Sequence, residues 1–177
     1  METIRPKEIA IELGDSLFRK VCPTESAALV SLADSTGIFN PHEAQDLLGG
    51  VLEELHAGRL EQGHQAHVWV TSFTSPVEGW IYFAPTEHAD GVWNVWWVGV
   101  APKCQGMGIG DALLKFAEDQ AFSAGGRLLL IETSSLPTFD PVRQFYSKRG
   151  YTECGRVPDY YAAGEAKVIY FKRLEGA

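Results

Sequence analysis

The sequence contains few cysteines and gives no sign of a cysteine-built scaffold. Cys22, Cys104 and Cys154 are odd in number and far apart along the 177 residues. This pattern argues against a disulfide framework and fits a reducing compartment. His64 and His67 form an HxxH pair without cysteine or carboxylate partners at metal-ligand spacing. We therefore interpret both histidines as strand-edge residues and predict no metal site.

Basic clusters and long apolar runs are also missing. The chain has 23 acidic and 15 basic residues, a formal net charge of -8 and no Lys- or Arg-rich run, which disfavours nucleic acid and favours a cationic substrate. No apolar run approaches the ~20 residues of a membrane helix. The first six residues, Met-Glu-Thr-Ile-Arg-Pro, lack the basic and apolar regions of a signal peptide. We expect a cytoplasmic protein with no nucleic-acid or membrane partner.

The composition is that of a folded enzyme-sized domain. Hydrophobic residues make up 45% of the chain, aromatic residues 11% and charged residues 21%, which is ordinary for a globular protein. No repeat or low-complexity linker divides the sequence. Residues 1–15 show no clear period, so we expect an N-terminal extension that can add one short strand, followed by a single domain over residues 16–177.

Hydrophobic spacing predicts strands and helices in alternation. The helix over 40–56 begins with Asn40 and Pro41 as N-cap and first helical residue. The pattern predicts an α/β (α+β) fold with a mixed, mostly antiparallel, twisted sheet of about six to seven strands, one central β-α-β crossover and helices on both faces. The expected strands cover 16–22, 66–73, 77–84, 92–100, 128–131, 151–157 and 167–172, and the expected helices cover 24–34, 40–56, 111–124 and 141–149.

A glycine-rich stretch joins the strand over 92–100 to the long helix that follows. Gly106, Gly108 and Gly110 alternate there, and such a turn lets backbone N–H groups point together at an anion beside the positive end of the helix dipole. No Gly-Lys-Ser/Thr follows, and Asp111 stands where the third glycine of the dinucleotide fingerprint belongs, so ATP and NAD are disfavoured. The stretch predicts a phosphate or pyrophosphate cradle; the alternative is a tight strand-to-helix turn without a ligand.

Two motifs in this chain resemble signatures of the GNAT superfamily of acyl-CoA-dependent N-acyltransferases. Gln105-Gly106-Met107-Gly108-Ile109-Gly110 resembles the family's Gln/Arg-x-x-Gly-x-Gly/Ala loop, preceded by Val100-Ala101-Pro102 in place of its Val-x-Pro step. Phe145-Tyr146-Ser147-Lys148-Arg149-Gly150-Tyr151, farther along the chain, is similar to the second signature, Phe-Tyr-x-x-x-Gly-Phe/Tyr. The resemblance covers residues 16–173.

The resemblance implies acetyl-CoA as the cofactor. It also implies two central parallel strands that splay apart and leave a slot in which pantetheine bonds to the backbone. By this analogy the loop amides hold the CoA pyrophosphate, and strand residues line the slot. The residues implied to bind the cofactor are Val98, Val100, Gln105, Gly106, Met107, Gly108, Ile109 and Gly110.

Acyl transfer to an amine needs a proton for the departing thiolate and a neutral amine. The phenol of Tyr146, with an ordinary pKa of ~10, is protonated at neutral pH and can donate to the thiolate, and the resemblance implies this role; the alternative is core packing against Phe145. Glu132, at the end of the apolar run 128–131, is the leading candidate for the base and resembles the glutamate that serves ribosomal-protein alanine acetyltransferases. A structural or substrate-orienting role for Glu132 is the alternative.

The acceptor side is less defined by the sequence. Many GNAT members carry an acidic residue six positions before the Val of Val-x-Pro, where this chain has Asn94. Asn94 cannot take a proton at neutral pH, so we expect it to orient the amine. Trp80, one of several tryptophans beside the implied slot, and Tyr161, in a loop before the last strand, are further acceptor candidates, although such aromatic residues often belong to a core.

These observations together predict an N-acetyltransferase that moves an acetyl group from acetyl-CoA to a primary amine of a small molecule or a protein, by direct attack. A non-catalytic acyl-CoA-binding or sensor module is the first alternative, and a nucleotide-binding interaction domain is the second. We expect a monomer or a homodimer. The sequence does not predict which amine is the acceptor.

Overall fold

The computed structural model describes residues 11–13, 16–38, 43–72 and 74–175. The chain forms two compact units. The first runs to Tyr82 and includes Val98–Leu113, and the second contains Phe83–Trp97 and the chain from Leu114 onward. Asn40 and Pro41, the predicted start of the second helix, lie outside the described residues. Among the helices of the described ranges, none combines the length and the apolar character that a membrane-spanning helix requires.

In the described part of the chain, eight strands hydrogen-bond in the order β1-β2-β3-β4-β5-β6-β8-β7. The predicted mixed, mostly antiparallel sheet with a parallel pair at its centre is confirmed, since β5 and β6 are parallel and β6, β8 and β7 pair antiparallel. The additional strand, β1, lies inside the predicted extension. The strands are β1 (Ile11–Leu13), β2 (Ser16–Lys20), β3 (Gln65–Val70), β4 (Gly79–Pro85), β5 (Val92–Val100), β6 (Leu128–Ser134), β7 (Thr152–Ala162) and β8 (Glu165–Arg173).

The helices follow the predicted segments with shifted ends. They are α1 (Ser26–Ser35), α2 (Gly50–His56), α3 (Ile109–Ser123) and α4 (Asp140–Lys148), with short 3₁₀ turns at Pro23–Glu25, Pro102–Cys104 and Pro137–Phe139. The predicted second helix contains a π-helical turn, Gln45–Gly49, directly before α2. Helix α3 begins two residues earlier than predicted, so Gly110 lies in its first turn.

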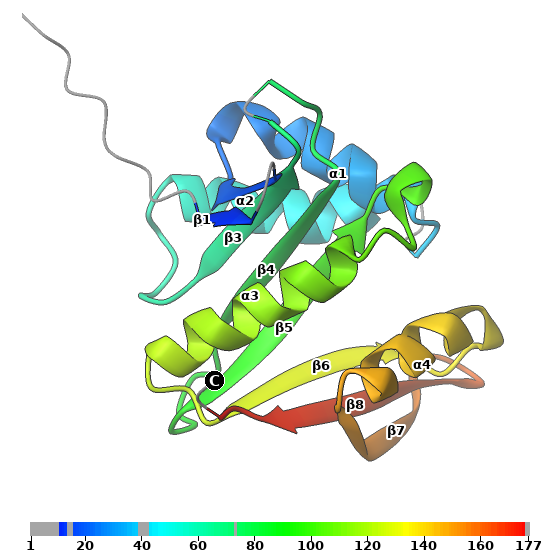
Figure 1. Ribbon diagram of the computed structural model, residues 1–177. Helices are drawn as coiled ribbons and strands as arrows, with labels where there is room; N and C mark the ends of the chain where they lie inside the picture. The colour runs from blue at the N-terminus through cyan, green and yellow to red at the C-terminus, as the bar shows by residue number, and fades with distance from the viewer. Residues whose placement is uncertain (1–10, 14–15, 39–42, 73, 176–177) are drawn as a thin grey trace, which may run out of the picture. The chain divides into compact units, whose positions relative to one another are not determined.

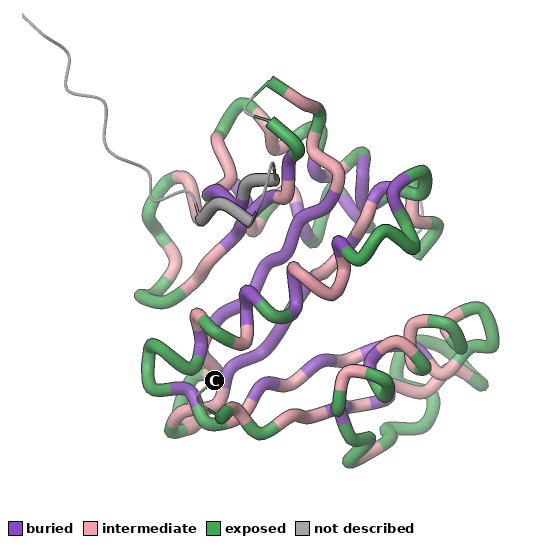
Figure 2. The backbone as a smooth tube through the Cα atoms, in the orientation of Figure 1, coloured by how far each residue is buried: buried purple, intermediate pink, exposed green. Residues whose placement is uncertain are grey.

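The core of the first unit is built by β2 and β3 together with α1 and α2. Phe18 on β2 packs edge-to-face on Trp69 of β3, with ring centroids 4.9 Å apart. The Trp80 indole Nε1 donates a hydrogen bond to the Leu29 carbonyl of α1 over 3.2 Å. Burial of apolar area of this kind is the main favourable term in folding. Figure 2 shows β3 as a mostly buried tube.

The second unit is organised around the β6–β8–β7 ladder. Strands β6 and β8 pair from Leu128–Arg173 to Ser134–Lys167, and β7 forms the outer strand. Side chains alternate between the two faces of a sheet. Tyr170 on β8 contacts Tyr146 of α4, with ring centroids 5.8 Å apart, so α4 lies against the face to which Tyr170 belongs (Figure 1).

Candidate active site

The glycine loop lies in the first unit, between β5 and α3. Gly106 has φ +78° and Gly108 has φ +83°, a left-handed conformation that favours glycine. A Cβ atom built on either glycine would meet nothing within 4 Å. The glycines are therefore required by backbone conformation, and the space beside them is open to a ligand.

This loop also fits a phosphate chemically. The first N–H groups of a helix have no acceptor within the helix, and the helix dipole favours negative charge at that end. Helix α3 begins at Ile109, directly after the second left-handed glycine. The Gln105 side chain links the loop to the end of β5, because its Nε2 donates a hydrogen bond to the Val100 carbonyl over 3.3 Å. An anion such as a pyrophosphate fits these open amides.

The structure brings the predicted cofactor residues together in the first unit. The Met107 residue is 71% exposed. The Ile109 side chain is buried, so Ile109 can offer a ligand only its backbone N–H. Val98 and Val100 on β5 are half-buried. The remaining predicted residues are exposed or half-exposed loop positions: Gln105, Gly106, Gly108 and Gly110.

The parallel pair at the centre of the sheet is joined over only part of its length. Its register runs from Val92–Leu128 to Val95–Ile131. Strand β5 continues beyond that point to Val100, through both predicted slot residues, and β6 continues to Ser134. The described ladder between β5 and β6 therefore ends at Val95 and Ile131.

Tyr146 lies in the second unit, on α4, and only 6% of it is exposed. Its ring packs 5.8 Å from that of Tyr170 and 6.1 Å from that of Tyr151. Burial raises the pKa of Tyr146, and the neighbouring Tyr170 adds to the effect. Tyr146 therefore belongs to an aromatic cluster, as the packing alternative predicts, and its phenol stays protonated at neutral pH.

Glu132 on β6 forms an ion pair that the sequence did not predict. Its Oε2 lies 2.5 Å from Nζ of Lys167 on β8. The same ammonium lies 3.9 Å from the ring centroid of Tyr160. Burial lowers the pKa of Lys167, but the hydrogen bonds to Glu132 and Tyr160 and the charges of these groups together raise it above its ordinary value, so the ammonium stays charged.

The two predicted catalytic residues lie on opposite faces of the β6–β8 pair. Glu132 pairs in register with Ile169, whereas its neighbour Ile131 pairs with Tyr170. Because side chains alternate, Glu132 belongs to the face opposite Tyr170. Tyr146 packs on the Tyr170 face. A bound molecule that contacts both Glu132 and Tyr146 therefore has to reach both faces of the β6–β8 pair.

Asn94 belongs to the same face as Glu132. It pairs in register with Leu130 of β6, and Leu130 and Glu132 are two residues apart on one strand. Asn94 is 5% exposed, and within the described part of the chain its Oδ1 has no hydrogen-bond partner. A buried amide oxygen without a partner costs about 1–3 kcal/mol. The site is therefore suited to a donor such as an amine.

The two aromatic residues predicted to contact the acceptor, Trp80 and Tyr161, differ in burial. Trp80 is 1% exposed and hydrogen-bonded to Leu29 in the first unit, so it is a core residue and we remove it from the acceptor candidates. Tyr161 is 48% exposed. It lies at the end of β7 and not in a loop, although the strand is irregular there and Asp159 has φ 52°. Burial is the main cause that raises the pKa of Tyr161.

Two further residues on this side of the second unit are exposed or charged: Trp96, one of the tryptophans expected beside the slot, and Lys167, which the sequence did not single out. Trp96, two residues after Asn94 on β5, is 55% exposed, and strand alternation puts it on the Asn94 face. Lys167 is three residues before Tyr170 on β8, so its side chain lies on the face opposite Tyr170. This is the face to which Glu132 belongs. The partner of Lys167 could not be found without the β6–β8 register.

The histidines play structural roles in the first unit. His64, just before β3, lies with Nδ1 2.5 Å from the Tyr82 hydroxyl. His67 lies inside β3, between β2 and β4, and is buried, so it is not the strand-edge residue that the sequence predicted. Within the described residues, no group of three or more His, Cys, Asp or Glu side chains could hold a metal ion.

Comparison with known proteins identifies the family. The model of the acetyltransferase (GNAT) domain matches residues 64–153, just over half of the chain, and this stretch contains the glycine loop, Glu132 and Tyr146. An uncharacterized N-acetyltransferase of Methanocaldococcus jannaschii is 32% identical over 81 residues, which are 45% of this chain and 51% of that protein. The chain thus spans about half the length of this curated relative.

Solved structures share the fold over most of the chain. A Desulfovibrio desulfuricans protein assigned to the GNAT family is 29% identical, with a TM-score of 0.84 over 90% of this chain and 99% of that one. An aminoglycoside 6'-N-acetyltransferase complexed with coenzyme A is 18% identical, with a TM-score of 0.69 over 90% of this chain and 98% of that one. The second similarity concerns the fold alone. The family match and the glycine loop lead to one conclusion: the chain belongs to the GNAT family of acetyltransferases.

Proposed function

We propose that this chain transfers an acetyl group from acetyl-CoA to a primary amine of a small molecule or a protein. The observation that carries the proposal is the pair of left-handed glycines, Gly106 and Gly108, with open space beside them at the start of α3. Such a backbone is suited to a pyrophosphate. Membership of the GNAT family supports coenzyme A as the molecule whose pyrophosphate binds there.

In this proposal the first unit binds the donor. The backbone N–H groups from Gly106 to Gly110 hold the pyrophosphate, beside Gln105, whose own N–H donates to the Pro102 carbonyl. The β5 backbone at Val98 and Val100 bonds to the pantetheine. When bound, acetyl-CoA supplies a thioester carbonyl carbon that a neutral amine can attack. The N–H groups at a helix terminus are already in position before the pyrophosphate binds, so little reorganisation is needed, and this favours binding of the anion.

Tyr146 is the proposed general acid. The amine forms a C–N bond to the acyl carbon, the C–S bond breaks, and the phenol gives its proton to the departing sulfur. Burial raises the pKa of Tyr146 above that of an ordinary tyrosine, so the proton is present throughout the neutral range. The amine releases one proton when the amide forms, and this proton restores the phenol, so no net charge accumulates.

The face of the second unit that carries Asn94 and Glu132 is the proposed acceptor side. The unpartnered Oδ1 of Asn94 can accept a hydrogen bond from the amine N–H. Glu132 attracts an ammonium group, and Tyr161 lies exposed on the same unit. Lys167 engages Oε2 of Glu132, so a base role for this carboxylate would have to use Oε1 or displace the ammonium. The ion pair therefore supports an orienting role for Glu132 more strongly than a base role.

One observation favours a second candidate function, a non-catalytic acyl-CoA-binding module. Tyr146 is packed in an aromatic cluster at 6% exposure, which is also what a purely structural tyrosine would show. Such a module would bind acetyl-CoA through the glycine loop and would release no thiol. The two candidates therefore differ in turnover and not in binding.

The test is thiol release from acetyl-CoA with a panel of amines, containing alkylamines, diamines, amino acids, an aminoglycoside and a peptide with a free N-terminus. The product is checked by mass spectrometry for one added acetyl group. Cys154 is exposed, so the protein without acetyl-CoA is the blank for the thiol reagent. Amine-dependent release supports the proposal. Binding of acetyl-CoA without release from any amine favours the non-catalytic module.

A further inference from the structure

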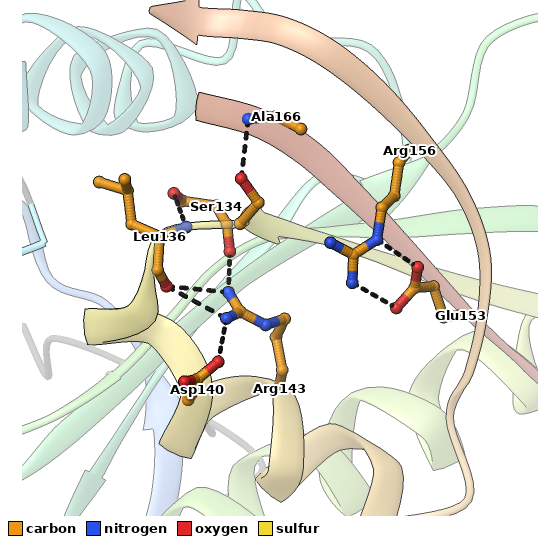
Figure 3. Close-up of polar contacts among 8 residues, drawn as sticks. Ser134, Leu136, Asp140, Arg143, Glu153, Arg156 and Ala166 are labelled. Carbon is orange, nitrogen blue, oxygen red and sulfur yellow. Dashed lines mark hydrogen bonds and ion pairs between the residues drawn. The ribbon is translucent and has the colours of Figure 1, made fainter. Parts of the chain in front are cut away.

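The connection from β6 to α4 is held by one arginine (Figure 3). Nη1 of Arg143 donates to the Ser134 carbonyl at the end of β6. Nη1 and Nη2 both donate to the Leu136 carbonyl over 3.1 Å. Nη2 also forms an ion pair with Asp140, the first residue of α4. One guanidinium thus joins the strand end, the turn and the helix start.

The connection from β6 to α4 also forms hydrogen bonds with the first residues of β8. The Ser134 hydroxyl donates to Glu165 over 2.6 Å and accepts from the Leu136 N–H over 3.1 Å. Ser135 and Ala166 exchange two hydrogen bonds, Ser135 N–H to the Ala166 carbonyl over 2.9 Å and Ala166 N–H to the Ser135 hydroxyl over 2.8 Å. The turn therefore cannot shift alone, and Arg143 sets where α4 begins relative to it.

Arginine is suited to this position in a way that no other residue is. Its planar guanidinium presents five N–H donors in a fixed fork, whereas lysine offers a point charge. The Arg143 side chain is only 12% exposed, so an unsatisfied charge there would be costly. The two carbonyls and the carboxylate satisfy it. If the guanidinium were removed, the Ser134 carbonyl would lose this donor, whereas the Leu136 carbonyl would keep the Phe139 N–H, 3.0 Å away.

The location of this arginine links it to both proposed catalytic residues. Arg143 lies three positions before Tyr146, on the same helix, and Ser134 lies two positions after Glu132, on the same strand. A guanidinium that fixes α4 to the end of β6 also fixes the Tyr146 phenol relative to that strand. We propose that Arg143 is a positioning residue that sets the Tyr146 phenol for proton transfer; the catalytic part of this inference rests on the proposed function.

A second arginine nearby provides a matched control. Arg156 on β7 forms a bidentate pair with Glu153, through Nε over 2.6 Å and Nη2 over 3.0 Å, and Figure 3 shows it beside the Arg143 cluster. Its side chain is 49% exposed and that of Glu153 is 36% exposed. Arg156 donates to Glu153 of its own strand, and Glu153 also interacts with Tyr170 of β8; neither contact involves α4 or the turn before it. Replacing it removes the same charge without loosening the helix.

The experiment follows the phenol directly. Protein labelled with ¹³C at tyrosine Cζ gives signals from six tyrosines, and Tyr146→Phe identifies the one from Tyr146. We expect Arg143→Lys and Arg143→Gln to shift or broaden the Tyr146 signal, with the Tyr82 signal of the first unit unchanged. Arg156→Gln is expected to leave the Tyr146 signal in place. A Tyr146 signal that is unchanged in both Arg143 variants overturns the proposal.

A kinetic measurement separates positioning from stability alone. With an amine that the wild-type protein acetylates, Arg143→Lys is expected to lower kcat roughly tenfold or more, because a small misplacement of a reacting group costs up to about 100-fold. The Kd for acetyl-CoA should stay the same. Added guanidinium should restore part of the turnover of Arg143→Ala. Equal turnover of Arg143→Lys and Arg156→Gln contradicts the proposal.

The two proposals can fail separately. If the wild-type protein acetylates no amine of the panel and the Tyr146 signal still moves in the Arg143 variants, the proposed function fails and the positioning of the phenol stands. If thiol release is amine-dependent and the Tyr146 signal does not move, the function stands and Arg143 is structural. Should Arg143→Gln not fold, Arg143→Lys carries the comparison.

Discussion

Glu132 and Lys167 form a cross-strand ion pair between β6 and β8, with Oε2 and Nζ 2.5 Å apart. The pair is diagonal in the ladder, because Glu132 is in register with Ile169 and Lys167 with Ser134. It puts a positive charge on the proposed acceptor face, beside the carboxylate that would attract an amine. The charge of Lys167 should therefore oppose the binding of a cationic acceptor.

Replacing Lys167 by Met tests this. We expect KM for a cationic alkylamine to fall roughly fivefold, since removing a charge from a partly buried pair changes the interaction by about 1 kcal/mol. Glu132→Gln should raise the same KM. Lys115→Met, which breaks an exposed pair with Asp119 on α3, is the control and should change neither. Initial rates across amine concentrations decide it, and an unchanged KM in both β6–β8 variants would remove this face from the acceptor site.

Gly108 should be essential for donor binding. An L-residue at φ +83° is strained by about 1–2 kcal/mol, so Gly108→Ala should reshape the loop and weaken acetyl-CoA binding by roughly tenfold or more. Gly125→Ala is the matched control, because Gly125 has φ +84°, open space around it and a place just past the other end of α3. Calorimetric titration with acetyl-CoA compares them. Equal affinities in the two variants would show that the loop does not hold the donor.

Tyr146→Phe should lower kcat about 100-fold and leave the Kd for acetyl-CoA unchanged, because only the proton donor is lost. Burial raises the pKa of Tyr146, so wild-type kcat should show no decline due to this phenol below about pH 10. Tyr82→Phe, which removes another hydroxyl from the other unit, should keep full turnover. Thiol-release rates between neutral and alkaline pH provide the measurement. Full activity in Tyr146→Phe would exclude the phenol as the acid.

His67 should make the protein sensitive to acid. Burial, and then the charge of Lys20, lower the pKa of His67 from 6.5 to about 4. The unfolded chain therefore binds a proton between these values that the folded chain does not, and folding stability falls as pH decreases through this window. The loss approaches about 3 kcal/mol near pH 4.

Denaturant unfolding from about pH 7 down to about pH 4 measures this loss. His67→Gln should flatten the decline. His88→Asn, at an exposed position with φ 59° that asparagine tolerates, should keep it. Parallel stability curves for wild type and His67→Gln would contradict the role of His67.

The part of the site that depends on local sequence could be predicted. Alternating glycines before an amphipathic helix determine a left-handed turn and a set of exposed amides, and both are found at Gly106 and Gly108. Helix α4 and Tyr146 follow from a short local motif in the same way. These features need no knowledge of which strands are neighbours.

The features that were missed depend on long-range packing. Trp80 is a core residue because α1, at Leu29, packs on β4, which hydrophobic spacing does not show. Lys167 and Arg143 gain their partners from the β6–β8 register and from the turn between β6 and α4. The short strand expected within residues 1–15 is β1, and its three residues are too few for an alternating pattern to predict its bounds.

The most direct test of the donor site is the thermal stability of the wild-type protein with acetyl-CoA, ATP or NAD. A ligand at about 100 times its Kd adds about 2.7 kcal/mol to the stability of the folded state. We predict a rise in Tm with acetyl-CoA and none with ATP or NAD. No rise with saturating acetyl-CoA, or a rise only with ATP or NAD, would contradict a coenzyme A site at the glycine loop.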